Sequence, residues 1–297
     1  MGKSRLTEDA ISEIARRYLA GETSTVLGVQ YGIHAGTVYD LLRTRGVPMR
    51  SRSAAKRRYA LRENAFRSIE DEPTAYWLGF LCADGCVTQR RGSGEVHLVL
   101  QGRDIPHLER YRAFLGTDAP IRKETHYATY RVSAYSKILA DDLIALGCTP
   151  NKSLKLIFPG ILPGLMPHFV RGYFDGDGSA MVLGEYQDPT IRFVGSSSFI
   201  PTLREAIRNV TQATGALSRH SRSPILYLTY RGAFQAEAIA TWLYTDATVW
   251  LQRKREVVAT FRSGKRAGYP TAYAYVGTTG NVSSETVRKY IEAQKGM

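Results

Sequence analysis

Two aspartates stand near the ends of two apolar stretches, and each is followed directly by a glycine. Asp84 lies in residues 75–87 (AYWLGFLCADGCV), and Asp177 lies in residues 169–180 (FVRGYFDGDGSA). If each stretch is a helix, both carboxylates lie at a helix C-terminus, where the dipole disfavours negative charge. Two such carboxylates side by side have raised pKa values unless a cation lies between them. Because Mg²⁺ binds carboxylate, carbonyl and phosphate oxygens, the pair predicts a metal site beside a phosphate.

The elements that must bring the aspartates together are the two apolar helices. A glycine lies five residues before each aspartate, Gly79 in the first stretch and Gly172 in the second. A glycine inside a helix costs roughly 1 kcal/mol, but it lets a second helix approach closely. We therefore expect the helices to pack against each other, with Asp84 and Asp177 at the end of their seam. A single Asp-Gly would mark only a helix stop and a turn.

The aspartates lie 93 residues apart, and the pattern of elements repeats with them. The expected elements of the first repeat are strands at 95–102 and 127–135 and a helix at 105–115. Those of the second repeat are strands at 179–186, 189–198 and 224–232 and a helix at 200–214. Each repeat ends in a helix and a basic stretch, at 151–160 and 251–261. We therefore predict two halves of similar order, residues 71–165 and 166–262, and a tail at 263–297 with a short helix.

The composition favours a polyanionic partner. The chain has 40 Lys and Arg against 27 Asp and Glu, which gives a formal net charge of +13. Neutralising phosphates releases counterions, so such an excess indicates nucleic acid; an anionic membrane is the rival, but no basic amphipathic helix stands out. The chain contains no run of about 18 apolar residues, so no membrane span is predicted. Three cysteines form no even disulfide set, which favours the cytoplasm, as in a bacterial or phage-infected cell. The spacing of Cys82 and Cys86 predicts buried thiols, not a zinc site.

Residues 1–48 show the pattern of a helix-turn-helix domain. An apolar stripe in residues 6–20 predicts a first helix, and Thr7, followed by two acidic residues, is expected at its start. A second helix capped by Thr23 or Ser24 follows, and Gly32 permits a sharp turn before a third helix that ends at Gly46. The second helix of such a motif enters the DNA major groove. The alternative is a three-helix bundle without a ligand. The predicted base-reading residues are His34, Thr37, Tyr39, Asp40 and Arg43.

A basic segment at 49–70 follows and is expected to be a linker. Its cations suit a phosphate backbone, although a solvated tether would have the same composition. The residues expected to contact DNA here are Arg50, Arg52, Lys56, Arg57 and Arg58.

The two apolar stretches resemble the LAGLIDADG homing endonuclease family, in its single-chain form with two motifs. WLGFLCADG (77–85) and VRGYFDGDG (170–178) align with the nine-residue signature, and the resemblance covers about residues 66–262. It implies an α+β fold of two αββαββα halves with saddle-shaped antiparallel sheets, joined through the motif helices. It also implies divalent ions held by Asp84 and Asp177, with the carbonyls of Ala83 and Gly176 as further ligands. The sixth signature position, Cys82 in one copy and Asp175 in the other, is not a metal ligand of the family.

The resemblance implies further site residues. The family uses a polar group on the sheet, which Gln101 matches, with Ser196 or Ser197 as a weaker counterpart. It also uses a basic residue near the end of each half, which Lys152 and Lys254 match, with Arg253 as a rival for Lys254. Side chains on the sheets are expected to read the major groove. These are His97, Gln101, Arg122, Lys123, Arg131, Arg192, Arg219, Arg222 and Tyr227.

The activity implied is that of a site-specific double-strand DNA endonuclease of the kind used in intron homing. The resemblance implies Mg²⁺, with Mn²⁺ as a substitute, and a long asymmetric DNA target. A duplicated chain satisfies its own interface, so we expect a monomer with no obligate protein partner and no membrane association. Two alternatives stay open: a non-cleaving transcriptional regulator with the same fold, in which the acidic positions are typically lost, and an RNA maturase.

Overall fold

The structure is a computed structural model that describes residues 6–20, 22–49, 58–125, 127–152, 155–183, 188–220 and 224–263. The chain divides into two compact units, residues 1–58 and 59–297. This boundary falls inside the segment predicted as a linker, 49–70. Its last residues belong to the second unit, because Phe66 is part of the core and the Arg62 N–H donates to the Leu115 carbonyl at 2.8 Å. The predicted tail lies outside the described residues from residue 264 onward.

The described residues of the first unit form three helices. Its helices are α1 (Glu8–Leu19), α2 (Ser24–Gln30) and α3 (Ala35–Thr44). The predicted caps are confirmed: the hydroxyl oxygens of Thr7 and Thr23 accept backbone N–H groups of the first turns of α1 and α2. Gly32 has φ of +64° in the turn before α3, a conformation that favours glycine. The core of this unit consists of Ile14, Tyr18, Leu27, Val38 and Leu42.

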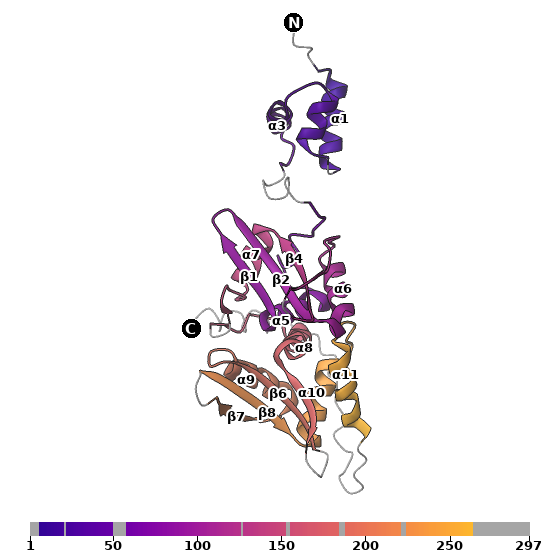
Figure 1. Cartoon of the computed structure of the whole chain (residues 1–297). Coiled ribbons are helices and arrows are strands. Elements are labelled where there is room, and N and C mark those ends of the chain that lie inside the picture. The colour runs from indigo at the N-terminus through magenta and orange to yellow at the C-terminus, as the bar shows by residue number, and fades with distance from the viewer. Residues whose placement is uncertain are drawn as a thin grey trace. The chain divides into compact units, whose positions relative to one another are not determined.

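The second unit contains two halves with the same order of elements (Figure 1). The first half consists of α5 (Glu72–Ala83), β1 (Gly85–Arg90), β2 (Ser93–Gln101), α6 (Ile105–Phe114), β3 (Arg122–Lys123), β4 (Thr129–Tyr135) and α7 (Lys137–Ala145). The second consists of α8 (Met166–Asp177), β5 (Ser179–Leu183), β6 (Asp188–Ser196), α9 (Ile200–Thr211), β7 (Ala216–Arg219), β8 (Ile225–Arg231) and α10 (Ala233–Tyr244), followed by α11 (Gln252–Ala259). The αββαββα order predicted for both halves is confirmed.

The two sheets have matching topology. Their antiparallel strands lie in the orders β1-β2-β4-β3 and β5-β6-β8-β7. Strand β1 and the short edge strands β3 and β7 were not among the expected strands. The helix expected at 200–214 ends instead at Thr211, because Gln212 adopts a left-handed conformation with φ of +59°.

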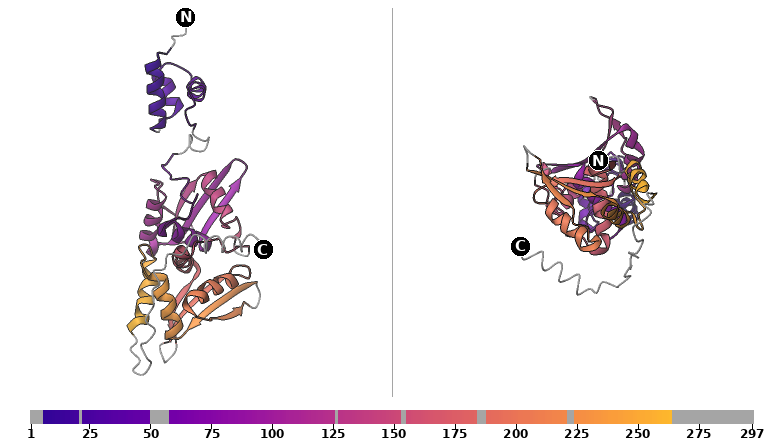
Figure 2. Two further views of the ribbon diagram at one scale, coloured as in Figure 1. Left: turned by 180° about the vertical axis from the view of Figure 1, so that it is seen from behind. Right: turned by 90° about the horizontal axis from the view of Figure 1, so that it is seen from below.

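Each sheet buries one face and leaves the other open. Along β2, buried and more exposed side chains alternate, so that Val96, Leu98 and Leu100 enter the core while Glu95 and His97 do not. The helices of each half cover the buried face (Figure 2). Each half therefore presents an open sheet face on which polar side chains can meet a ligand.

Helices α5 and α8 pack against each other between the two sheets (Figure 1). A Cβ atom added to Gly79 would lie 2.0 Å from the Phe169 carbonyl oxygen, and one added to Gly172 would lie 1.9 Å from the Tyr76 carbonyl oxygen. Any side chain at either glycine would force the helices apart, because real Cβ atoms do not approach backbone so closely. The predicted glycine seam is confirmed.

Candidate metal and DNA site

The two motif aspartates lie at adjacent helix ends. Asp84 caps the C-terminus of α5, and Asp177 is the last residue of α8. The backbone that carries them is in close contact, because a Cβ atom added to Gly176 would lie 2.3 Å from the Ala83 Cβ and 3.4 Å from the Asp84 nitrogen. Both aspartate side chains are exposed. The seam therefore delivers two carboxylates to one accessible place.

The electrostatics of the pair follow from this placement. Desolvation by the surrounding protein, followed by the nearby charge of Asp84, raises the pKa of Asp177 to about 6. Desolvation also raises the pKa of Asp84, although Lys254, Lys152 and Arg253 oppose the rise. Among the residues that the structure describes, no side chain or backbone N–H hydrogen-bonds to either carboxylate. Two accessible acceptors that repel each other are a donor set suited to a hard divalent cation.

The two predicted lysines lie at equivalent places, one in each half. Lys152 Nζ donates to the Gly85 carbonyl oxygen, and Lys254 Nζ donates to the Gly178 carbonyl oxygen at 2.6 Å. Each of these glycines follows the aspartate of its own half. Each lysine therefore lies beside the motif aspartate of its own half.

Lys254 makes further hydrogen bonds. It is 6% exposed, and its ammonium also donates to the carbonyl oxygens of Phe174 (2.6 Å), Asp175 (2.7 Å) and Gly176 (3.0 Å) at the end of α8. Burial lowers the pKa of Lys254 to about 8, so it remains a cation at neutral pH. The Gly176 carbonyl, a predicted metal ligand, already accepts one hydrogen bond from this ammonium.

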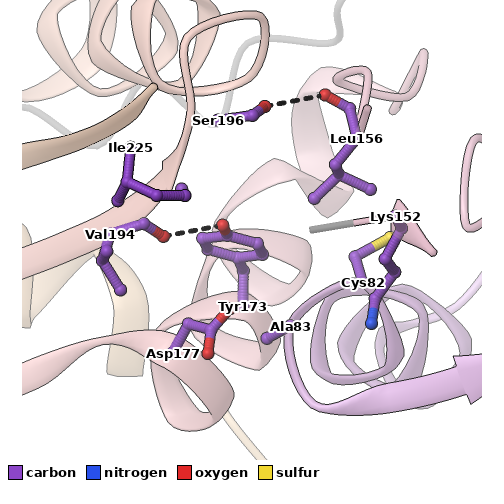
Figure 3. Close-up of a pocket in the computed structure, with 10 residues that line it drawn as sticks. Cys82, Ala83, Lys152, Leu156, Tyr173, Asp177, Val194, Ser196 and Ile225 are labelled. Carbon is purple, nitrogen blue, oxygen red and sulfur yellow. Dashed lines mark hydrogen bonds between the residues drawn. The ribbon is translucent and has the colours of Figure 1, made fainter. Parts of the chain in front are cut away.

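A cavity of about 260 Å³ opens beside Asp177 and Lys152. Figure 3 shows these two residues with Ala83 along one edge of the cavity. The hydroxyl of Ser196 donates to the Leu156 carbonyl at 3.1 Å, and that of Tyr173 to the Val194 carbonyl at 2.8 Å. The lining residues are Cys82, Ala83, Lys152, Leu156, Tyr173, Asp177, Val194, Gly195, Ser196 and Ile225.

Asp175 is the residue near the site whose contacts the sequence did not predict. It is fully buried, and its carboxylate accepts hydrogen bonds from the Leu251 N–H at 2.7 Å, the Tyr76 hydroxyl at 2.8 Å and the Tyr244 hydroxyl at 3.3 Å. Tyr76 has one hydroxyl proton, so His107 Nε2, at 3.0 Å, donates to it. The available signal was an acidic residue directly after Phe174 in a helix expected to pack inside the molecule, because a buried acid requires hydrogen-bond donors.

The predicted polar groups of the sheets lie in equivalent register but differ in exposure. The pairings of β1 with β2 and of β5 with β6 place Gln101 and Ser196 at matching positions. Gln101 is exposed, whereas Ser196 is 2% exposed and bonded to Leu156.

The predicted DNA-reading side chains are distributed over both faces of the sheets. His97, Arg122 and Arg131 share the open face of the first sheet, and Arg192 and Tyr227 lie on that of the second. The strand register places Lys123 opposite Tyr130 and Arg219 opposite Leu226, on the faces that the helices cover, although both side chains are exposed on edge strands.

Several other predicted residues have assigned partners or lie elsewhere. Arg253 pairs with the buried carboxylate of Asp104 at 3.1 Å. Cys82 is buried as predicted, but Cys86 is exposed because α5 ends before it and β1 turns it outward. Arg58 is exposed at the end of the first unit. Arg50, Arg52, Lys56, Arg57 and Arg222 lie outside the described residues.

In the first unit, the predicted reading residues lie on or beside α3. Thr37, Tyr39, Asp40 and Arg43 are exposed. The ring of His34 is the N-terminal cap of α3, because its Nδ1 accepts the Gly36 N–H at 3.1 Å.

Two features are absent among the described residues. In the described part of the chain, no three or more His, Cys, Asp or Glu side chains are grouped to hold a metal, so a cation at Asp84 and Asp177 would need oxygen ligands of another kind. Within the same residues, none of the helices has both the length and the apolar character required to cross a bilayer.

No protein-family model and no curated protein sequence matches the chain. Among solved structures, it is similar in fold to the I-LtrWI LAGLIDADG homing endonuclease bound to target DNA, with 13% identity and a TM-score of 0.46 over 76% of this chain and 98% of that one. The I-SmaMI LAGLIDADG homing endonuclease bound to cleaved DNA matches with 13% identity and a TM-score of 0.46, over 77% and 97% of the two chains. I-SmaMI bound to uncleaved DNA with calcium ions matches with 13% identity and a TM-score of 0.44, over 77% and 99%. These proteins are from the family that the two sequence motifs resemble.

Proposed function

We propose that the protein is a site-specific double-strand DNA endonuclease that depends on divalent metal ions. The observation that carries the proposal is the pair of accessible carboxylates, Asp84 and Asp177, held without protein partners among the described residues at the joined ends of α5 and α8. Such a pair is unfavourable by itself, since Asp177 has its pKa raised to about 6. A divalent cation would offset this repulsion, and the net charge of +13 would attract the DNA phosphate that adds oxygen ligands to the cation.

Asp84 and Asp177 would hold Mg²⁺, with Mn²⁺ as a substitute, and the carbonyls of Ala83 and Gly176 are the additional ligands that we propose. A bound ion of this kind supplies Lewis acidity to the phosphate and lowers the pKa of water. The protein contributes the placement: the glycine seam fixes the carboxylates, and the cavity beside Asp177 leaves room for a phosphate and water.

The lysines have different proposed roles. Lys152 uses one hydrogen bond to Gly85 and lines the cavity, so its remaining donors can meet a phosphate oxygen as charge develops there. Lys254 is held by four carbonyl oxygens and acts as a fixed positive charge near both aspartates. Gln101, exposed at the end of β2, is proposed to orient water or a sugar–phosphate group.

The open sheet faces are the proposed DNA-reading surface. His97, Arg122, Arg131 and Arg192 point from these faces, and α3 of the first unit adds a second reading element. The two halves differ in sequence and a separate domain extends the contact, so the target is proposed to be long and asymmetric, bound by a monomer.

The test is cleavage of a randomised DNA library with Mg²⁺, Ca²⁺ or EDTA, with all new ends sequenced. Wild type is compared with Asp84→Asn and Asp177→Asn. We expect discrete double-strand ends with short 3′ overhangs in Mg²⁺, and a loss of about 10³-fold or more in each variant. Salt-sensitive binding to a defined sequence without new ends in any metal would reject the nuclease and favour the regulator.

A further inference from the structure

The segment that joins α10 to α11 is held by side chains from α5 and α8. Glu72 of α5 accepts the N–H groups of Thr248 at 2.6 Å and Val249 at 3.2 Å. Arg171 of α8 donates from Nε to the Val249 carbonyl oxygen at 2.8 Å. Arg171 is fully buried and pairs with Glu72, so the guanidinium that binds the segment is itself held in place.

Asp175 holds the end of this segment, where α11 begins. Its carboxylate accepts the Leu251 N–H at 2.7 Å, and Leu251 is the N-terminal cap of α11. The side chain of Leu251 makes no capping hydrogen bond, so a carboxylate from another helix satisfies this end. Negative charge at a helix N-terminus also interacts favourably with the dipole.

The first turn of α11 carries Lys254. Its ammonium reaches back to the carbonyl oxygens at the end of α8, beside the two motif aspartates. Asp175 lies two residues before Asp177 on α8, and its own carbonyl oxygen is one of these acceptors. Its carboxylate accepts the backbone N–H of Leu251, three residues before Lys254. A loss of the Asp175 contact would release the start of α11 and, with it, this ammonium.

We propose that Asp175 is a positioning residue that fixes the start of α11 and so seats Lys254 at the end of α8; its relevance to cleavage rests on the proposed nuclease function. Among the residues that the structure describes, the thiol of Cys82, at the matching position of the first motif, makes no such hydrogen bond to backbone. There the thiol of Cys148, four residues before Lys152, donates to the Leu81 carbonyl at 3.4 Å, which is a weaker attachment.

The first experiment is amine labelling of the folded protein, which needs no activity. The full chain is treated with an acetylating N-hydroxysuccinimide ester, and Lys254 is compared with exposed Lys137 by mass spectrometry. Asp175→Cys installs the first motif's residue and removes the acceptor for Leu251. We expect Lys254 to react about tenfold faster in this variant, because local opening of the helix start exposes it.

Two control variants sharpen the labelling test. Tyr244→Phe removes only the 3.3 Å bond and should stay within about threefold of wild type. Asp175→Asn keeps an acceptor oxygen for the Leu251 N–H but removes the charge that raises the pKa of Lys254, so its rate measures the charge effect alone, which Asp175→Cys must exceed. Should Asp175→Cys fail to fold, Leu251→Pro removes the donor instead at a backbone φ of −83° that proline tolerates. Unchanged protection of Lys254 in a folded Asp175→Cys or Leu251→Pro variant overturns the proposal.

The second experiment is a double-mutant cycle on strand-resolved cleavage with Mg²⁺. If Asp175 acts through Lys254, Asp175→Cys lowers kcat about tenfold, mainly on one strand and with KM unchanged, and adds nothing in a Lys254→Met background. Independent, additive losses on both strands overturn the positioning role. If wild type cuts no DNA, the nuclease function fails, while the labelling result still decides whether Asp175 seats Lys254.

Discussion

The two halves share one topology but hold their motif helices in different ways. In the first half, the end of α5 is met by one hydrogen bond from a half-buried lysine, Lys152, and the sixth motif position is a thiol, Cys82. In the second half, the end of α8 is met by four hydrogen bonds from a buried lysine, Lys254, and the sixth motif position is the buried carboxylate of Asp175. At the same site, the lysine of the first half thus makes few hydrogen bonds to its motif helix, whereas the lysine of the second half makes many.

The difference separates two tasks that a basic residue can perform. A lysine saturated by carbonyl oxygens stabilises a helix end and supplies a constant field, whereas a lysine with spare donors can change partners when substrate binds. We therefore expect Lys254 to matter more for stability and Lys152 more for turnover.

The largest expected effect is on the stability of lysine variants. Lys254→Met removes one donor from each of four carbonyl oxygens, of which that of Phe174 still accepts the Gly178 N–H at 2.8 Å, and should lower the free energy of unfolding by roughly 2–4 kcal/mol. Lys152→Met removes one hydrogen bond at a half-buried position and should cost less than about 1 kcal/mol. Urea unfolding of both variants measures the difference, and equal losses would remove the distinction between the halves.

The sequence predicted the parts of the site that repeat. The glycines Gly79 and Gly172 and the aspartates after them indicated a helix seam with paired acids, because both depend on local pattern and matched spacing. The four hydrogen bonds from Lys254 to carbonyl oxygens depend on how the segment at 248–251 packs across α5 and α8. That tertiary contact could not be predicted from any local sequence pattern. Strand β3 has only two residues, which is too few to show an alternation of apolar and polar side chains. The sheet face on which Lys123 lies could therefore not be predicted from the sequence.

The open sheet faces give a second comparison, with a smaller expected effect. Arg131 of the first sheet contacts Glu95 at 2.7 Å, Ser133 and His97. Among the described residues, Arg192 of the second sheet donates only to Thr229, at 3.1 Å, and it lies over the ring of Tyr227. Arg192 is the freer donor for DNA. Arg192→Ala should therefore weaken binding about tenfold.

Glu95→Gln is the counterpart on the first sheet. It should release Arg131 toward the DNA and strengthen binding by about threefold at low salt, since a carboxylate facing phosphates is also removed. Binding titrations across a salt series measure both variants. If Arg131→Ala lowers the DNA affinity more than Arg192→Ala does, the contacts of Arg131 with Glu95 and its neighbours already orient it toward a base or phosphate.

The smallest expected effect concerns the pH dependence of the metal-free protein. The folded pKa of Asp177 is about 6, above the ordinary value of 3.8, so the folded state prefers this carboxyl protonated. Its contribution is favourable below about pH 4 and is lost as the pH rises through about 6. Because the side chain is exposed, solvent screening limits the loss to roughly 1 kcal/mol.

Asp177→Asn should therefore be more stable than wild type at pH 7, by up to that amount, and equal to it near pH 4. Asp84→Asn should gain less, because Lys254, Lys152 and Arg253 already offset the charge of Asp84. Millimolar Mg²⁺ should stabilise wild type at pH 7 and neither variant to the same degree, since a ligand stabilises only the state that binds it. Thermal unfolding at pH 4 and 7, with Mg²⁺ or EDTA, measures all three. A wild type whose stability is indifferent to both pH and Mg²⁺ would mean that the two carboxylates neither repel each other nor share a cation, and the site would then lose its electrostatic basis.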